Sequence, residues 1–340
     1  MASRVSSLGT RARRRSSSNY SRHESHDPMV SLIVCTRNRA AKLRRLLQAF
    51  HSLEMPSGSR VEFIVVDNGS TDETPQVCKT AEEMFNGRMR CFFSAEPGVG
   101  HARNLGMAHA RGDIFAFIDD DVVPKHDWLT VICQQFAADA ELALLSGQVQ
   151  LYDPLDLPLT IRTSTTRRRF DSIADAFSLL AGCNFAVRRQ YVEKVRGFDS
   201  HFGAGTPFPV EDSDFFYRVW RAEGKLIYEP SMFVWHDHGR RSTADKCALV
   251  RGYMIGRGAF YSKHVFARDK SVLQACYWEL TGLVKALFRG TSNYGWPSLG
   301  WLLRGFGSHA LTCAWRSRRP RPALAPSRPA FPAAGTAEYL

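Results

Sequence analysis

Three consecutive aspartates, Asp119, Asp120 and Asp121, follow directly after the apolar run Ile114–Ile118. Two carboxylates about 4 Å apart repel each other by roughly 4 kcal/mol at an effective dielectric constant near 20, so a cation between them removes a substantial penalty. Side chains alternate between faces along an extended segment, which predicts that Asp119 and Asp121 point to one side and Asp120 to the other. The pattern therefore predicts a site for Mg²⁺ or Mn²⁺, whose remaining ligands are water and phosphate oxygens. A solvated acidic loop ahead of Pro124 is the alternative.

The aspartates close the last of four short apolar segments that alternate with segments of helical spacing. These segments are Val30–Cys35, Val61–Val66, Arg90–Ser94 and Ile114–Ile118. The regular succession of strand and helix predicts an α/β fold with a Rossmann-like, mostly parallel sheet flanked by helices. Ligands bind such sheets beyond the carboxyl ends of the strands. Four polar sequences that could form a site stand at those ends: CTRNR, VDNGSTD, EPGVG and IDDDV.

The second half of the chain holds another acidic segment, EDSDFFYRVWRAEG, which is predicted to be a helix over residues 211–224. Glu211, Asp212 and Asp214 would lie in its first turn, where each acid complements the helix dipole by about 0.3–1 kcal/mol. KLIYEP and MFVWH then predict two further strands, and the second of them ends in His236. From there to about residue 315 the pattern is helical and aromatic.

The net charge of +12 is carried by the two ends of the chain. Six arginines precede Glu24 and five lie after residue 315, so the body between them is close to neutral. Residues 1–28 are Arg- and Ser-rich and residues 316–340 are Pro-, Ala- and Arg-rich, and we expect both to be disordered tails. A transit peptide has a similar composition, but the apolar stripe of an amphipathic helix is missing. A polyanion-binding protein that acts through these tails is an alternative, although the body has no basic stripe interleaved with aromatic residues.

Several classes of protein are excluded by what the sequence lacks. Eight cysteines without a CxxC pair argue against a zinc site and against a disulfide framework. There is no clean run of 18 apolar residues and no secretory signal, so a cytoplasmic location is expected. Gly98 and Gly100 are not followed by the third glycine of a dinucleotide fingerprint, and no GxxxxGK[ST] phosphate loop is present.

Six segments, taken in order, resemble the successive motifs of family 2 glycosyltransferases with the GT-A fold. They are SLIVCTRNR, VVDNGSTDET, PGVGHARNLG, GDIFAFIDDDVVP, GFDSHFGAGTPFPVEDSDFFYR and YEPSMFVWHDH, and they cover about residues 28–240. The resemblance implies an inverting enzyme that moves a sugar from a nucleotide diphosphate sugar, expected to be UDP-linked, to a hydroxyl of a glycan, glycolipid or related acceptor. It also implies that Mn²⁺ or Mg²⁺ binds at the DXD motif. Cys35, Arg37 and Asn68 depart from the residues frequent at their positions, which leaves the donor open.

The same resemblance assigns roles to individual residues. Asp121 would be the principal metal ligand, with Asp119 and His236 beside it. Asp212 would be the base that takes the proton of the acceptor hydroxyl, which requires the carboxylate to lie within about 3 Å of that hydroxyl. Residues expected to line the nucleotide side of the cleft are Thr36, Arg39, Asp67, Arg103 and Asp119.

Each of these residues has an ordinary structural alternative. The sequence DNG at Asp67 favours an Asx turn in any protein. Arg103 could pair with a surface acid, and His236, like His238, could be a polar residue at the end of a strand. Glu211 and Asp214 are expected to be structural.

The predicted organisation is a nucleotide-binding half over residues 29–124, an acceptor half over 125–240 and a helical C-terminal extension over 241–315. The extension mixes aromatic residues and leucines with Lys and Arg, which fits helices in a membrane interface near a lipid-linked acceptor. A helical subdomain or a dimer contact would have the same composition. A sugar nucleotidyltransferase is the second enzyme class, since it also uses paired acids and a metal, but it would release pyrophosphate instead of a nucleoside diphosphate. No specific nucleic-acid partner is expected.

Overall fold

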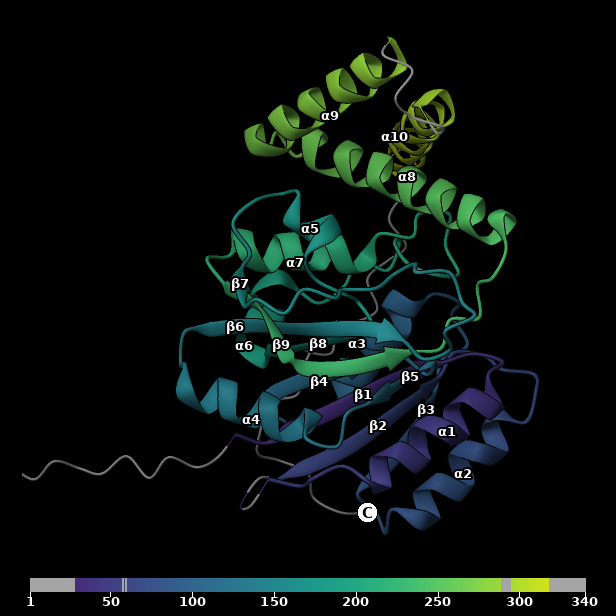
Figure 1. Ribbon diagram of the computed structural model, residues 1–340, viewed down its shortest axis with the longest axis vertical. Coiled ribbons are helices and arrows are strands. Elements are labelled where there is room, and N and C mark those ends of the chain that lie inside the picture. The colour runs from purple at the N-terminus through teal and green to yellow at the C-terminus, as the bar shows by residue number, and fades with distance from the viewer. Residues whose placement is uncertain (1–27, 57, 59, 289–294, 318–340) are drawn as a thin grey trace, which may run out of the picture.

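The apolar segments of the N-terminal half form the parallel part of a central sheet. The computed structural model describes residues 28–288, apart from 57 and 59, and residues 295–317 (Figure 1). The first four strands are β1 (Val30–Thr36), β2 (Val61–Asp67), β3 (Met89–Phe93) and β4 (Ile114–Ile118), in the spatial order β3-β2-β1-β4. All three pairings are parallel, so the carboxyl ends of these strands share one edge of the sheet. The four predicted strands are confirmed.

The other strands continue the sheet with mixed direction. They are β5 (Val122–Pro124), β6 (Leu142–Leu151), β7 (Arg168–Arg169), β8 (Asn184–Arg188) and β9 (Lys225–His236). From β4 the order runs β8-β6-β9-β5, with β7 paired to β9. β8 is antiparallel to β4 and to β6, whereas β6 and β9 are parallel. This is the mostly parallel α/β architecture expected from the sequence, with the antiparallel pairs in the second half.

The prediction of two separate strands in KLIYEP and MFVWH is wrong, because they form the single strand β9. Its pairing with β6 shifts register between Gly147 and Gln148, where the partner changes from Glu229 to Phe233. Pro230 lies in the segment skipped by this shift, and a bulge is where a strand tolerates a residue without an N–H donor. The continuous strand carries His236 to the edge of the sheet where the aspartates lie.

Helices cover both faces of the sheet and bury a separate apolar cluster on each. One face is covered by α1 (Ala40–His51), α2 (Thr74–Met84) and α4 (Trp128–Ala138), and the other by α3 (Val99–His109), α5 (Asp175–Ser178), α6 (Arg189–Val195) and α7 (Glu211–Arg221). In α1 the buried residues Leu43, Leu46, Leu47 and Phe50 recur at intervals of three and four, as a helix facing a sheet requires.

Three long helices form a further layer above α5 and α7 (Figure 1). They are α8 (Thr243–Phe266), α9 (Lys270–Phe288) and α10 (Gly295–Ser317). Phe260 of α8, Val272 of α9 and Leu302 of α10 belong to the same buried apolar cluster as the residues of α7. The helical character predicted for this part of the chain is confirmed, and the layer shares its core with the domain beneath it.

A buried ionic network also joins α7 to α8. The Asp214 side chain is fully buried and accepts from Arg218 Nε at 2.7 Å, while His264 Nε2 and Lys263 Nζ each lie 2.8 Å from its Oδ1. Lys263 Nζ also lies 2.8 Å from Asp199 Oδ2. Burial acts to raise the pKa of Asp214, but Arg218, His264 and Lys263 outweigh it and hold that pKa far below its usual range. Asp214 therefore has the structural role expected for it, as a fully paired buried charge.

The crossing of α8 and α10 depends on two glycines. A Cβ built on Gly258 would lie 2.0 Å from the Leu302 carbonyl oxygen, and one built on Gly305 would lie 2.0 Å from the Ile255 carbonyl oxygen. Each backbone therefore approaches the other at a position that admits no side chain.

We expect Gly305→Ala to destabilise the protein by about 1–3 kcal/mol, because the added methyl forces the two helices apart. The matched control is Gly307→Ala on the same helix, where an added Cβ meets nothing within 4 Å. That control should stabilise the helix by up to about 1 kcal/mol through its higher helix propensity. Thermal unfolding of the two variants measures the contrast. Equal melting temperatures would contradict the close crossing.

The predicted tails at residues 1–28 and 316–340 lie almost wholly outside the described residues. Within the described part of the chain, no helix is long and apolar enough to cross a bilayer. The described cysteines form no disulfide.

Candidate functional site

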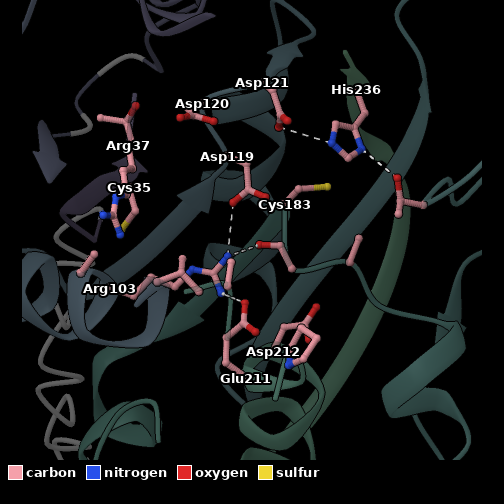
Figure 2. Close-up of a pocket in the computed structure, with 18 of the residues that line it drawn as sticks. Cys35, Arg37, Arg103, Asp119, Asp120, Asp121, Cys183, Glu211, Asp212 and His236 are labelled. Atoms are coloured by element: carbon pink, nitrogen blue, oxygen red, sulfur yellow. Dashed lines mark hydrogen bonds and ion pairs between the residues drawn. The ribbon is translucent and has the colours of Figure 1, made fainter. Parts of the chain in front are cut away.

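A cavity of about 400 Å³ opens at the sheet edge where β1 and β4 end. Its walls come from the ends of these strands, the first turns of α3 and α7, the 180–183 segment, the end of β9 and helix α8. Figure 2 shows the acidic and basic side chains that converge on it. Residues that line the cavity and enter the argument below are Thr36, Arg37, Arg39, Asn68, Arg103, Asp119, Asp120, Asp121, Thr160, Arg162, Gly182, Glu211, Asp212, His236, Arg240 and Tyr253. Of the predicted site residues, all but Asp67 line it.

The three aspartates do not alternate as predicted. Arg39 Nη1 lies 2.8 Å from Asp120 Oδ1 and 2.7 Å from Asp121 Oδ2, so these two neighbours share one cation. Asp119 instead accepts from Arg103 Nη2 at 3.2 Å. The expected pairing of Asp119 with Asp121 fails because residues 119–121 form the turn between β4 and β5 and are not extended. Burial raises the pKa of Asp120 to about 6, although Arg39 opposes the shift.

Asp121 lies against His236, which the continuous strand β9 brings to the same edge. His236 Nε2 is 3.3 Å from Asp121 Oδ1, and both side chains are buried (Figure 2). Burial acts to raise the pKa of Asp121, but the hydrogen bond and charge of His236, together with Arg39, hold it well below its usual range. Asp121 is therefore ionised at neutral pH.

Thr160 orients the imidazole of His236. Its hydroxyl donates to the Leu159 carbonyl oxygen at 2.7 Å and lies 3.2 Å from His236 Nδ1. A hydroxyl has one hydrogen to donate, so the network assigns Nδ1–H as the donor to Thr160. A metal-binding histidine usually donates the N–H of its other ring nitrogen to a fixed acceptor, as Nδ1 does here to Thr160.

The donor set of Asp121 and His236 fits a divalent cation. Two ligands at adjacent corners of an octahedron with bonds of about 2.1 Å stand about 3 Å apart, close to the spacing found here. The predicted trio is not preassembled, however, because Asp119 is paired with Arg103. Across the described residues, no three His, Cys, Asp or Glu side chains converge closely enough to hold an ion. The remaining ligands of a bound cation would come from water and from a phosphorylated substrate.

Arg103 joins the two halves of the site. Its guanidinium is buried and donates to Asp119 Oδ1 at 3.2 Å, to Glu211 Oε1 at 3.1 Å and to the Gly182 carbonyl oxygen at 3.1 Å. Burial, followed by the neighbouring Asp212, raises the pKa of Glu211 to about 7 despite Arg103. The alternative of a surface ion pair is wrong for Arg103, which is an internal bridge between the end of β4 and the start of α7.

Asp212 faces the cavity from the first turn of α7 (Figure 2). Its Oδ1 accepts from the backbone N–H of Ser213 at 2.7 Å, and the described residues offer it no ion-pair partner. A Cβ built on Gly182 would lie 2.5 Å from Asp212 Oδ2, so a larger residue at this position requires the Asp212 side chain to shift. An unpaired carboxylate at a cavity wall can accept a proton from a bound hydroxyl. The sequence did not single out Gly182 or Thr160, since neither lies in a segment with a recognisable pattern.

We expect Gly182→Ala to lower kcat about 10- to 100-fold, because the methyl pushes the Asp212 carboxylate from its place and small displacements of a reacting group are costly. The affinity for nucleotide and the melting temperature should change little. A double-mutant cycle with Asp212→Asn checks the cause, since the double variant should be no slower than Asp212→Asn alone. If the losses in kcat of the two single variants add up in the double variant, the effect of Gly182→Ala does not act through Asp212.

The nucleotide side of the cavity differs from the prediction at one residue. Thr36 and Arg39 line it as expected. Asp67 does not line it, and its Oδ1 accepts from the Ser70 N–H at 2.9 Å, a local contact three residues on where an Asx turn would use the N–H two residues on. The next residue, Asn68, lines the cavity and ties the end of β2 to the loop before α3, with Gly98 N donating to its Oδ1 at 2.9 Å.

Known proteins similar to this chain are sugar transferases. Residues 31–196 match the family described as Glycosyl transferase family 2. The chain is 28% identical over 244 residues to the Pre-mycofactocin glycosyltransferase of Mycobacterium tuberculosis, an alignment that covers 68% of this chain and 46% of that protein. The chain thus spans about half the length of this curated relative.

Solved structures share the fold over longer stretches. The mannosyltransferase PcManGT from Pyrobaculum calidifontis, in complex with GDP-Man and Mn²⁺, aligns with a TM-score of 0.58 at 20% identity over 87% of this chain and 89% of that one. S. aureus TarS 1-349, in complex with UDP-GlcNAc, aligns with a TM-score of 0.53 at 16% identity over 68% of this chain and 65% of that one. At these identities the likeness shows the fold.

Proposed function

We propose, from the premise that this chain is a family 2 glycosyltransferase with the GT-A fold, that it transfers a sugar from a nucleotide diphosphate sugar to an acceptor hydroxyl with inversion. The single observation that supports the proposal most is the placement of Asp212 and of the Asp121–His236 pair in the walls of one cavity. A single displacement needs a base on one side of the anomeric carbon and charge stabilisation for the leaving group on the other. The expected donor is UDP-linked, and the acceptor is a glycan, a glycolipid or a related molecule.

In the proposed mechanism, six residues of the cavity each have a role. Asp212 takes the proton of the acceptor hydroxyl. Gly182 has no side chain and so leaves space for the Asp212 carboxylate. Asp121 and His236 hold Mg²⁺ or Mn²⁺, with Thr160 orienting the imidazole. Bound there, the cation would supply Lewis-acid stabilisation of the departing diphosphate. Arg103 holds the side chains of Asp119 and of Glu211, the first residue of α7, in place by donating a hydrogen bond to each.

The experiment is a panel of nucleotide sugars with Mn²⁺, scored for the released nucleotide product. A glycosyltransferase releases nucleoside diphosphate, whereas a nucleotidyltransferase releases pyrophosphate, so the product separates the two classes. Release of pyrophosphate, or no release with any donor, would contradict the proposal.

We further propose a cytoplasmic location with peripheral contact between the C-terminal helices and a membrane surface. Large apolar side chains are exposed on one face of α9, at Leu273, Tyr277, Val284 and Phe288, and on one face of α10, at Trp296, Leu303, Leu311 and Trp315. Their spacings of 4, 7, 8 and 11 residues place them along one side of each helix. Residues 243–317 carry nine Lys or Arg against three acids over the described positions, which suits an anionic surface.

Flotation with vesicles tests the membrane contact. We expect the protein to float with phosphatidylglycerol vesicles and to lose that binding on the paired change Tyr277→Asp and Leu311→Asp. The control is Met84→Asp, which alters an exposed apolar side chain on α2, at the opposite side of the sheet. Failure of the native protein to float, with dimers in solution instead, would make these helix faces a contact between copies of the chain.

A further inference from the structure

Arg162 and Arg240 line the cavity and form no ion pair with a described carboxylate. The Arg162 guanidinium donates only to backbone carbonyl oxygens, those of Leu180 at 3.2 Å, Ile161 at 2.9 Å and Phe177 at 3.5 Å. Arg240 forms no ion pair within the described residues, and its Nη1 is buried without a hydrogen-bond partner. Leaving a buried polar group unpaired costs about 1–3 kcal/mol, and more when it is charged. A group that the fold leaves unpaired in a cavity wall is a candidate contact for a ligand.

The other ion pairs of the cavity form without these two arginines. Arg39 pairs with Asp120 and Asp121, and Arg103 pairs with Asp119 and Glu211. A nucleotide diphosphate sugar would bring two negative charges, which a divalent cation at Asp121 balances. Arg162 and Arg240 take no part in these ion pairs.

Arg162 and Arg240 line the same cavity as Asp212. Tyr253 of α8 lines the same cavity, with about half of its side chain exposed. Desolvation, followed by the negative charge of Asp212, raises the pKa of its hydroxyl, while Arg162 and Arg240 act in the opposite direction. Tyr253, Asp212, Arg162 and Arg240 line one cavity, so the two arginines share with the proposed base the space in which an acceptor would bind.

We propose that the acceptor carries an anionic group, a phosphate or a carboxylate, next to its reactive hydroxyl, and that Arg162 and Arg240 bind this group. The inference rests on the proposed transfer to an acceptor at Asp212 and adds the chemical class of that acceptor. Arginine suits the task because its planar fork can donate two parallel hydrogen bonds to a phosphate or a carboxylate. The phenol of Tyr253 would form the remaining wall of the subsite.

Calorimetric titration of small anions into the full-length protein, saturated with UDP and Mg²⁺, tests the subsite. The probes are phenyl phosphate and benzoate, which separate the two anions, and benzyl alcohol, which is their neutral counterpart. UDP occupies the donor site beforehand, so binding there is blocked. We expect one of the two anions to bind and benzyl alcohol not to bind.

Substitutions identify the residues responsible. Arg240→Gln should weaken binding of the anion at least tenfold, about 1.4 kcal/mol, while Arg240→Lys retains part of it. The matched control is Arg251→Gln, on the exposed side of α8 close to Tyr253, which should leave the anion affinity unchanged. Arg162→Lys keeps the positive charge but replaces the planar guanidinium with an ammonium group. Weaker anion binding by this variant, with an unchanged melting temperature, supports bidentate contact.

Three results would overturn the subsite. They are the absence of anion binding, binding that Arg240→Gln leaves unchanged, and a loss of UDP affinity in Arg240→Gln, which would make Arg240 a contact of the donor diphosphate. Failure of the proposed transferase activity is a separate outcome, because it would appear as no nucleoside diphosphate release in the donor panel while anion binding could still depend on Arg240.

Discussion

Asp212→Asn is expected to lower kcat by about 10²–10⁴-fold, the usual contribution of a general base, with nucleotide affinity unchanged. The amide has nearly the shape of the carboxylate, so it can occupy the same place opposite Gly182 and keep the N–H contact with Ser213. What it loses is the ability to take a proton from the acceptor hydroxyl. Nucleoside diphosphate release gives kcat, and titration with UDP gives the affinity.

A matched control separates the base from a general effect of removing negative charge. Asp171→Asn makes the same substitution at an exposed carboxylate whose ion-pair partner is the exposed Arg169. Its kcat should equal that of the native enzyme. If Asp212→Asn also turned over at the native rate, the proton would have to go to another acceptor, and Glu211 would be the next carboxylate to change.

Asp121→Asn is expected to weaken Mn²⁺ binding by at least about 100-fold and to reduce kcat/KM by at least as much. The carboxylate is one of the two donors that stand together before any substrate binds, and an amide oxygen carries no charge to hold the cation. Manganese titration followed by electron paramagnetic resonance, in the presence of UDP, measures the affinity without relying on turnover.

Asp120→Asn is the comparison that locates the metal. Asp120 is the neighbour of Asp121 and shares Arg39 with it, but in the structure it has no contact with His236. We expect its manganese affinity to fall far less than that of Asp121→Asn. Equal losses would mean that the whole acidic turn binds the cation, with no special place for the Asp121–His236 pair.

Local patterns in the sequence were sufficient for the strands and for most of the cavity. The first four strands are short runs with both faces apolar, and the residues at their carboxyl ends meet because parallel pairing aligns those ends. The six motifs correctly indicated the family and the GT-A fold. Thr36, Arg39, Arg103, Asp212 and His236 all line the cavity that these predictions require.

The errors concern backbone geometry and contacts between distant segments. An extended backbone predicts alternation through Asp119–Asp121, where the chain turns, and the break at Pro230 predicts two strands where one strand bulges and continues. Nothing near Thr160 and Arg162 in the sequence indicates a site, and Arg240 lies just beyond the last of the six motifs, YEPSMFVWHDH. Their proximity to Asp212 and His236 depends on the long connection between β6 and β8 and on the end of β9, which pack only in the folded chain.

The buried network around Asp214 joins the C-terminal helices directly to the helix that carries the proposed base. Asp214 lies two residues from Asp212 on the same helical turn, and Lys263 and His264 grip it from α8. The outer layer of helices and the proposed base are therefore linked through buried side-chain contacts, with no intervening loop. The boundary between the domain and its extension is a division of the sequence, since the two share this network and one apolar cluster in the folded protein.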